Sequence, residues 1–218
     1  MCFSATASFI AFGVTGVTGL AAVARIRRLK ELPLAAIPLV FASQQGIEGM
    51  LWLTLPVAPQ GPASSLFTHL FIILAKVLWP VYAPLAILMV EPDRRRQRLL
   101  AVCLAAGAGA AVYFLGSIFS SPHSAFILNS HVVYSSEPNL PVVISLLYLA
   151  ATGFAPILSS QRVVVLFGAV VLLGSIITYL FYWEAYTSVW CFFAAAGSVV
   201  ILAHFERARR AHQSAVRA

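Results

Sequence analysis

Residues 163–183 read VVVLFGAVVLLGSIITYLFYW, a run of apolar and small polar residues without a single charge. A helix needs about 20 mostly apolar residues to cross the roughly 30 Å of hydrocarbon in a bilayer. The run lacks the strict alternation of polar and apolar residues that a membrane strand would show. This stretch therefore predicts a transmembrane helix.

The composition extends this prediction to the whole chain. Of its 218 residues, 61% are hydrophobic and only 10% are charged, and the mean hydropathy is +0.91. A soluble domain has roughly 45–50% apolar and about 25% charged residues. A water-soluble globule of this size could not bury so much apolar surface, and the composition also excludes a disordered chain, a disulfide scaffold and a coiled coil. We therefore predict a polytopic membrane protein.

The sequence contains seven stretches that are long and apolar enough to be spans. The predicted fold is an all-α bundle of seven transmembrane helices, a single domain over residues 1–205, followed by a short basic tail at 206–218. The predicted spans cover about residues 6–24, 33–55, 65–90, 99–120, 140–159, 163–183 and 185–205.

Charge placement predicts the direction of insertion. Every lysine and arginine except Lys76 falls on one side of the seven-span arrangement. The positive-inside rule then places the N-terminus outside and the C-terminus in the cytoplasm. The net charge of +7 is explained by orientation signals and contacts with anionic lipids of the inner leaflet, and no nucleic-acid partner is expected. The basic residues are Arg25, Arg27, Arg28, Lys30, Arg94, Arg95, Arg96, Arg98, Arg162, Arg207, Arg209, Arg210 and Arg217.

Two motifs carry a resemblance to a known family. The chain opens with MCFSATASF at residues 1–9, and the second predicted span contains FASQQGIEG at residues 41–49, followed by Trp52. In these motifs the chain resembles an uncharacterised family of small bacterial multispanning membrane proteins. The resemblance implies a multi-pass protein of the bacterial cytoplasmic membrane, and it implies no activity.

Glu48 and Lys76 are the charges that lie well inside predicted spans, where an ionised side chain costs a few kcal/mol unless it is compensated. At 1.5 Å per residue, Glu48 lies roughly 12 Å and Lys76 roughly 16 Å below the outer surface. We expect an ion pair between them inside the bundle. One interpretation is a structural pair that fixes helix register; the other is a ligand site, proton relay or catalytic centre.

Several polar and aromatic residues accompany this pair. Gln44, Gln45 and Trp52 share the helical face of Glu48, so they are candidate ligand-binding residues. His69 and Trp79 flank Lys76 and are further candidates. Pro80 should free the carbonyl of Lys76 from the helix ladder, because proline has no N–H to donate.

The outer side offers a second candidate site. Cysteine, histidine and glutamate are metal-ligand types, so an outer cluster could bind zinc, copper or iron, although no spacing here is diagnostic and each histidine also fits a solvated loop. Removal of the initiator methionine would also give Cys2 a free amine, as an N-terminal nucleophile has. The candidate metal ligands are Cys2, His123, His131, Glu137 and Glu184.

Three functions fit these residues. The first is the binding or transport of a small molecule or ion at a buried Glu48–Lys76 site that opens outward. The second is a membrane-embedded enzyme in which Glu48 is the acid/base and Cys2 or a bound metal supplies the nucleophile or Lewis acid, with Lys76 as a further candidate catalytic residue. The third is an accessory subunit of a larger membrane complex, in which the pair serves assembly alone.

Overall fold

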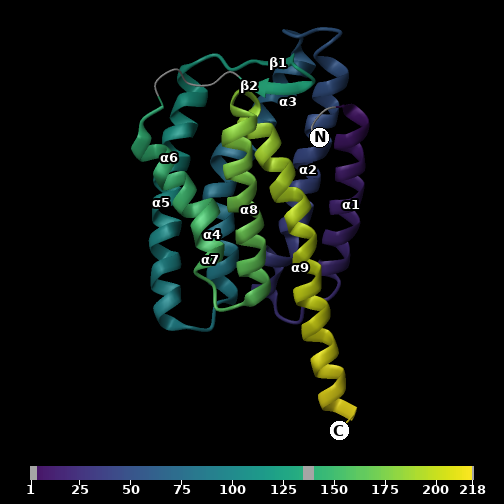
Figure 1. The fold of residues 1–218 in the computed structure, drawn as a ribbon, viewed down its shortest axis with the longest axis vertical. Helices are drawn as coiled ribbons and strands as arrows, with labels where there is room; N and C mark the ends of the chain where they lie inside the picture. The colour runs from purple at the N-terminus through teal and green to yellow at the C-terminus, as the bar shows by residue number, and fades with distance from the viewer. Residues whose placement is uncertain (1–3, 135–139, 218) are drawn as a thin grey trace.

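The chain folds into long helices that pack side by side, and the C-terminal helix projects beyond the others (Figure 1). The computed structural model describes residues 4–134 and 140–217, without the side chains of 208 and 210–217. The helices are α1 (Ala5–Val23), α2 (Leu32–Thr54), α3 (Pro62–Ile72), α4 (Trp79–Val90), α5 (Arg94–Ser120), α6 (Val142–Leu149), α7 (Ala155–Ile157), α8 (Arg162–Phe181) and α9 (Tyr186–Arg217). Short helical segments are η1 (Leu29–Glu31), η2 (Ile73–Leu78), η3 (Ala150–Phe154) and η4 (Trp183–Ala185).

Each predicted span corresponds to a helical stretch, and the ends agree to within a few residues except at the C-terminus. There α9 continues to Arg217, so the segment predicted as a separate basic tail extends the last helix. Among the described residues, five helices are long and apolar enough to cross a membrane: Ala5–Val23, Pro62–Val90, Arg94–Ser120, Arg162–Phe181 and Trp183–Arg207. The other two stretches differ for separate physical reasons. Helix α2 contains the polar residues Gln44, Gln45 and Glu48, which lower its mean hydropathy, and the apolar helix Val142–Ile157 is shorter.

The span Pro62–Val90 changes its helical register before Pro80. Segment η2 is a π-helix, in which the N–H of Trp79 donates to the carbonyl of Leu74, five residues earlier. Pro80 has no N–H to offer the next carbonyl, that of Ala75, and the Tyr148 hydroxyl of α6 donates to it at 2.6 Å. The sequence predicted that the carbonyl of Lys76 would lose its helical partner. Because the π-helix pairs each N–H with the carbonyl five residues earlier, the carbonyl that Tyr148 binds is that of Ala75.

The span Val142–Ile157 repeats this arrangement. Segment η3 is also a π-helix, in which the N–H of Ala155 donates to the carbonyl of Ala150. Pro156 is the next residue after Ala155, as Pro80 is after Trp79. Both π segments pack against α5. At Gly107 of α5, a Cβ would lie 1.8 Å from the carbonyl oxygen of Pro80 and 2.8 Å from the Cβ of Ala151. Gly107 therefore allows the two bent spans and α5 to meet in the middle of the bundle.

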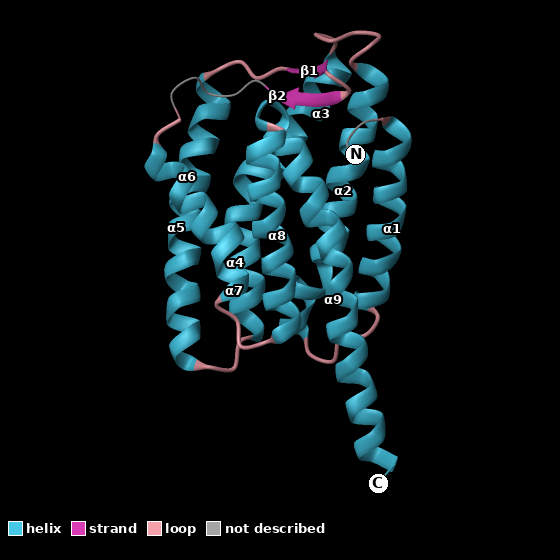
Figure 2. Ribbon diagram, viewed as in Figure 1, coloured by secondary structure: helices cyan, strands magenta, loops and turns pink. Residues whose placement is uncertain are grey.

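A β-hairpin corrects the all-α prediction at one point. Strands β1 (Ala125–Leu128) and β2 (His131–Tyr134) pair antiparallel, with Ala125 opposite Tyr134, in a segment that the sequence analysis treated as a loop. The turn residues Asn129 and Ser130 both have positive φ, as a two-residue type I′ turn requires. Figure 2 shows the hairpin at the end of the bundle opposite the projecting tail of α9. We call this the hairpin end.

The described part of the first motif, residues 4–9, packs against the motif at 41–49. Helices α1 and α2 are in extensive contact, and a Cβ on Gly49 would lie 2.8 Å from the Phe9 ring. A Cβ on Gly46 would lie 3.2 Å from the ring of Phe12. The glycines of α2 therefore receive aromatic rings of α1, on the side of α2 that neighbours the polar residues.

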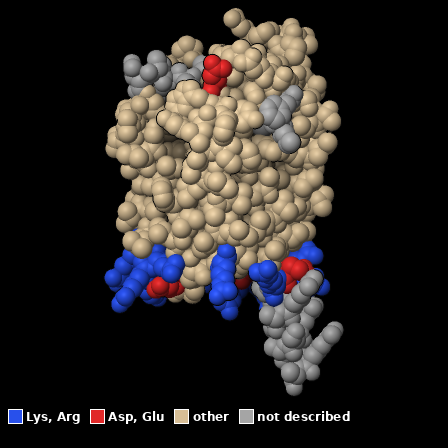
Figure 3. Space-filling model, viewed as in Figure 1, with Lys and Arg blue, Asp and Glu red and all other residues tan. Residues whose placement is uncertain are grey.

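Basic side chains gather at the end of the bundle opposite the hairpin. In the face shown in Figure 3, the Lys and Arg atoms form a band where the α9 tail leaves the bundle, and the surface above it is uncharged except for an acidic patch near the opposite end. Arg25 lies in the α1–α2 connection and binds Glu206 of α9 at 2.8 Å, so even distant parts of the chain meet there. We call this the basic end.

Candidate functional site

Three polar side chains on one face of α2 are fully buried. Gln44, Gln45 and Glu48 each have 0% relative exposure, although they belong to residue types that are rarely buried without a partner. We call these three residues the α2 polar set. Because α2 packs against α1, α4 and α9, the set lies between helices and away from the outer surface of the bundle.

Neighbouring helices hold two members of the set. The indole N–H of Trp79 in α4 donates to Gln44 Oε1 at 2.7 Å. The hydroxyl of Ser188 in α9 donates to Glu48 Oε1. Cys191, one turn further along α9, is buried and lies within interaction range of Gln44 and Glu48. The set therefore joins α2 to α4 on one side and to α9 on the other.

Several buried hydrogen-bonding groups of α1 and α2 lack partners in the described part of the chain. Both polar atoms of the Gln45 amide are buried without a hydrogen bond, and so is the indole N–H of Trp52. On the neighbouring helix α1, the buried hydroxyl of Ser8 is in the same state. A buried group without a hydrogen bond costs about 1–3 kcal/mol, and such groups are few in native proteins. Their concentration here is typical of a binding site.

An aromatic-walled cavity of about 30 Å³ adjoins the polar set. Its lining includes Phe41, Trp79, Tyr148, Trp190 and Cys191. Phe41 stacks on Trp79 with ring centroids 4.0 Å apart, and the Tyr148 and Trp190 rings lie 5.6 Å apart. The cavity has room for about two water-sized groups, and its aromatic rings belong to a side-chain type that attracts cations. Its wall meets the polar set through Trp79, which donates to Gln44.

Lys76 lies in the π segment η2, and its side chain contacts an aromatic ring of α5. Its Nζ lies 5.3 Å from the centroid of the Phe114 ring, a cation–π geometry. Glu48, by contrast, is bound from α9. The ion pair between Glu48 and Lys76 stays a prediction, because the contacts described for these two side chains involve different helices.

Three histidines lie at the hairpin end and divide into two groups. His69 of α3 lies near His123, with ring centroids 6.4 Å apart, and the Nδ1 of each is in hydrogen-bond range of a backbone carbonyl. His131 of β2 instead packs edge-on against Tyr182, with centroids 5.3 Å apart. Burial lowers the pKa of His131, which favours its neutral form.

The structure describes only part of the predicted outer metal site. Glu184 is exposed in η4, while Cys2 and Glu137 lie outside the described residues. Within the residues that are described, no group of three or more His, Cys, Asp or Glu side chains could hold a metal ion. The outer metal site therefore stays a prediction.

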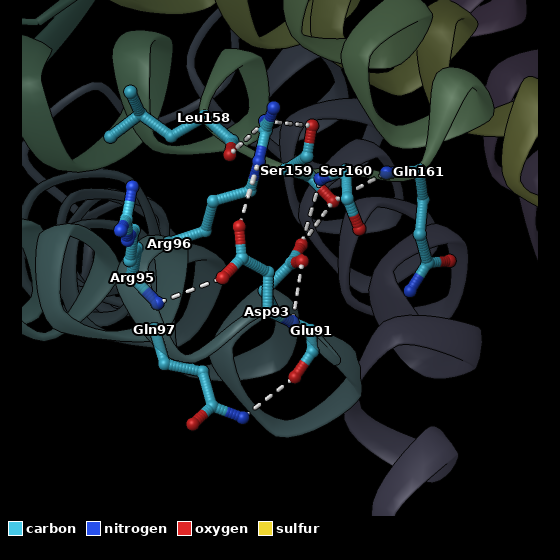
Figure 4. A network of polar contacts seen from close by, with 9 residues as sticks. All are labelled: Glu91, Asp93, Arg95, Arg96, Gln97, Leu158, Ser159, Ser160 and Gln161. Atoms are coloured by element: carbon cyan, nitrogen blue, oxygen red, sulfur yellow. Dashed lines mark hydrogen bonds and ion pairs between the residues drawn. The ribbon is translucent and has the colours of Figure 1, made fainter.

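A second buried carboxylate, which sequence analysis did not single out, lies at the basic end. Glu91 is 2% exposed and accepts hydrogen bonds from Ser159 Oγ at 3.0 Å and from the Ser160 N–H at 2.8 Å. Arg96 donates to the carbonyls of Leu158 and Ser159 in the same loop. Figure 4 shows this network, which fastens the α4–α5 connection to the α7–α8 connection.

Sequence analysis also missed Ser188 and Cys191, which complete the surroundings of Glu48. They follow Glu48 by more than a hundred residues, and α9 is apolar enough around them to look like a packing helix. The available signal was their position on one helical face, three residues apart. That signal could not identify α2 as the helix they face.

Comparisons with known proteins give a family and no activity. No curated protein and no solved structure matches the chain. Residues 1–217 match a family of unknown function, DUF6629, which agrees with the resemblance to an uncharacterised family. Because the match covers nearly the whole chain, this protein belongs to the DUF6629 family.

Proposed function

We propose that this protein binds a small monovalent cation at the α2 polar set and serves its passage or sensing across a bacterial cytoplasmic membrane. The observation that carries the proposal is the fully buried Glu48 beside a Gln45 amide that has no partner among the described residues. A carboxylate inside a membrane bundle is costly unless a positive charge or hydrogen bonds compensate it. A bound cation would add positive charge beside this carboxylate and would use the hydrogen-bonding capacity of the Gln45 amide oxygen.

The chemistry around Glu48 suits a small cation. Oxygen atoms of Glu48, Gln45 and Ser188 belong to the ligand types that alkali and ammonium ions accept. The aromatic rings of the adjoining cavity add faces that attract positive charge, and the cavity's size of about 30 Å³ favours an ion over a larger solute.

In the proposed topology, seven helices cross the membrane with the N-terminus outside and the C-terminus in the cytoplasm. Support comes from the band of Lys and Arg side chains at the basic end, since cytoplasmic loops are rich in these residues. The hairpin end then faces outward. Val132 and Tyr134 of β2 belong there to the same buried cluster as Leu51 and Leu55 of α2, so the hairpin covers this end of α2.

Thermal unfolding of the purified protein in a neutral detergent tests the proposal. The probes are NaCl, KCl and NH₄Cl, compared with N-methylglucamine chloride at equal ionic strength. A bound ion stabilises the folded state by about 2.7 kcal/mol at 100 times its Kd, so at least one small cation should raise the unfolding midpoint saturably. Glu48→Gln should abolish this rise and remain folded.

A matched glutamate at the basic end supplies the control. Glu31 accepts a hydrogen bond from the backbone N–H of Arg27 at 2.9 Å, far from the polar set along α2. Glu31→Gln should keep the response to the cation. An equal response in Glu48→Gln and the native protein would overturn the proposal, as would a native protein that responds to no small cation. The second result would favour the accessory-subunit alternative.

A further inference from the structure

An open groove lies at the basic end, where α4 finishes and α5 begins. It is lined by Leu88 of α4 and by Arg94, Gln97, Arg98 and Ala101 of α5. Two guanidinium groups and two apolar side chains therefore border the same groove. Lipid headgroups meet protein in surroundings of this kind, where charge and apolar surface adjoin.

The start of α5 places both arginines on one face. The Asp93 side chain caps the helix by accepting from the Arg95 N–H at 2.9 Å, so α5 begins at Arg94. Arg98 follows Arg94 by one helical turn, and Ala101 follows Arg98 by three residues. The helix therefore presents two guanidinium groups with an apolar position directly above them.

The charges of these two arginines are not used inside the protein. Arg96 lies between them in sequence, and its guanidinium donates to the carbonyls of Leu158 and Ser159 at 2.8 and 2.9 Å. Arg94 and Arg98 are exposed and, within the described part of the chain, make no hydrogen bond or ion pair. Two neighbouring positive charges thus remain available to a ligand.

The surface next to the groove is suited to acyl chains. On α5, Leu99 and Val102 are 52% and 67% exposed, and Met89 of α4 is 38% exposed. These side chains lie beside the arginines at the ends of helices that are long and apolar enough to cross a membrane. Charged surface gives way to uncharged surface immediately above the band of basic residues (Figure 3).

We propose that this groove binds an anionic phospholipid. Arg94 and Arg98 hold its phosphate with charge-assisted hydrogen bonds, and an acyl chain lies along Leu88 and Ala101. Gln97 anchors the groove to the loop network, because its Nε2 donates to the Glu91 carbonyl at 2.7 Å. The site is thus built on a rigid joint between α4 and α5, and it is independent of the proposed cation site.

Native mass spectrometry of the full chain in neutral detergent tests this inference. The probes are dioleoyl phosphatidylglycerol and dioleoyl phosphatidylcholine, and the variant is Arg94→Gln with Arg98→Gln. A cation near an anionic lipid contributes about 1 kcal/mol, so losing two should weaken phosphatidylglycerol binding about 30-fold. Binding of phosphatidylcholine should be weak and unchanged.

A double variant with the same loss of charge gives the control. Arg28 and Lys30 are exposed in the α1–α2 connection and line no part of this groove. Arg28→Gln with Lys30→Gln should weaken phosphatidylglycerol binding less than about twofold. Equal losses in the two double variants would overturn the proposal in favour of general attraction to the basic end. Displacement of the lipid by inorganic phosphate at equal concentration would also overturn it, because the site would then recognise phosphate without its acyl chains.

Discussion

Glu48 and Glu91 are both buried glutamates, at 0% and 2% exposure, but their surroundings differ. Glu91 is surrounded by donors: Ser159, Ser160 and the backbone N–H of Asp93 all bind its carboxylate. Glu48 accepts from Ser188, yet the adjacent Gln45 amide has no partner in the described chain. The comparison separates a carboxylate that joins two loops from one that lies beside hydrogen-bonding groups left for a ligand.

The largest expected effect is on stability at Glu91, and it depends on pH. Burial alone would raise the pKa of this carboxyl, but hydrogen bonds from Ser160, Asp93 and Ser159 outweigh burial and lower it below 4.5. The stabilisation is therefore present above about pH 4.5 and is lost as pH falls through the lowered pKa. At neutral pH, Glu91→Gln should reduce the free energy of unfolding by about 2 kcal/mol.

Thermal unfolding midpoints of the native protein and Glu91→Gln, measured across the acidic range, check this prediction. The gap between the two proteins should narrow as pH falls below about 4.5, because the native carboxylate becomes protonated. A gap of constant size would show that Glu91 stabilises the joint without its charge. The contrast with Glu48 would then rest on geometry alone.

The second prediction compares the same substitution in the two regions and expects opposite signs. Gln45→Leu removes a buried amide without a partner, so it should raise the free energy of unfolding by about 1 kcal/mol. Gln97→Leu removes the 2.7 Å hydrogen bond to the Glu91 carbonyl, so it should lower that free energy by about 1 kcal/mol. Unfolding of each variant in detergent, measured without added small cations, gives both values.

The sign of the Gln45 result decides the comparison. A loss of stability in Gln45→Leu equal to that in Gln97→Leu would mean that the Gln45 amide is satisfied in the folded protein. The two regions would then both be structural joints, and the cation proposal would lose its main support.

Hydropathy was sufficient to predict the helices, because long apolar runs separated by charged or proline-containing segments are visible along the sequence itself. It was not sufficient for the hairpin, whose strands of four residues are too short to give a periodic signal. Pro80 predicted that the backbone hydrogen bonds of this helix are interrupted. Whether the helix then breaks or forms a π segment depends on its packing against α5 and α6. This packing is tertiary, so the residues around Pro80 do not predict it.

The sequence predicted the part of the candidate site that lies on α2, and it did not predict the part contributed by α9. Gln44, Gln45 and Glu48 stand out in α2 because polar residues are costly inside a span. Ser188 and Cys191 could not be assigned to them, since the contact of α2 with α9 is tertiary. Glu91 was inconspicuous because it precedes a run of arginines and reads as part of a solvated loop, whereas the fold buries it against Ser159.

The smallest expected effect concerns two serines of α9. Ser188 and Ser198 are both fully buried, but the Ser188 hydroxyl donates to Glu48, whereas the Ser198 hydroxyl donates to the carbonyl of Ala195 in its own helix at 2.6 Å. Each serine-to-alanine change should cost about 1 kcal/mol or less. If Ser188 orients the Glu48 carboxylate toward a cation, Ser188→Ala should raise the half-saturating cation concentration several-fold in the unfolding assay, and Ser198→Ala should leave it unchanged. An equal half-saturating concentration in the two variants would mean that Ser188 only contributes to packing. Glu48 would then resemble Glu91, a buried carboxylate that joins parts of the fold.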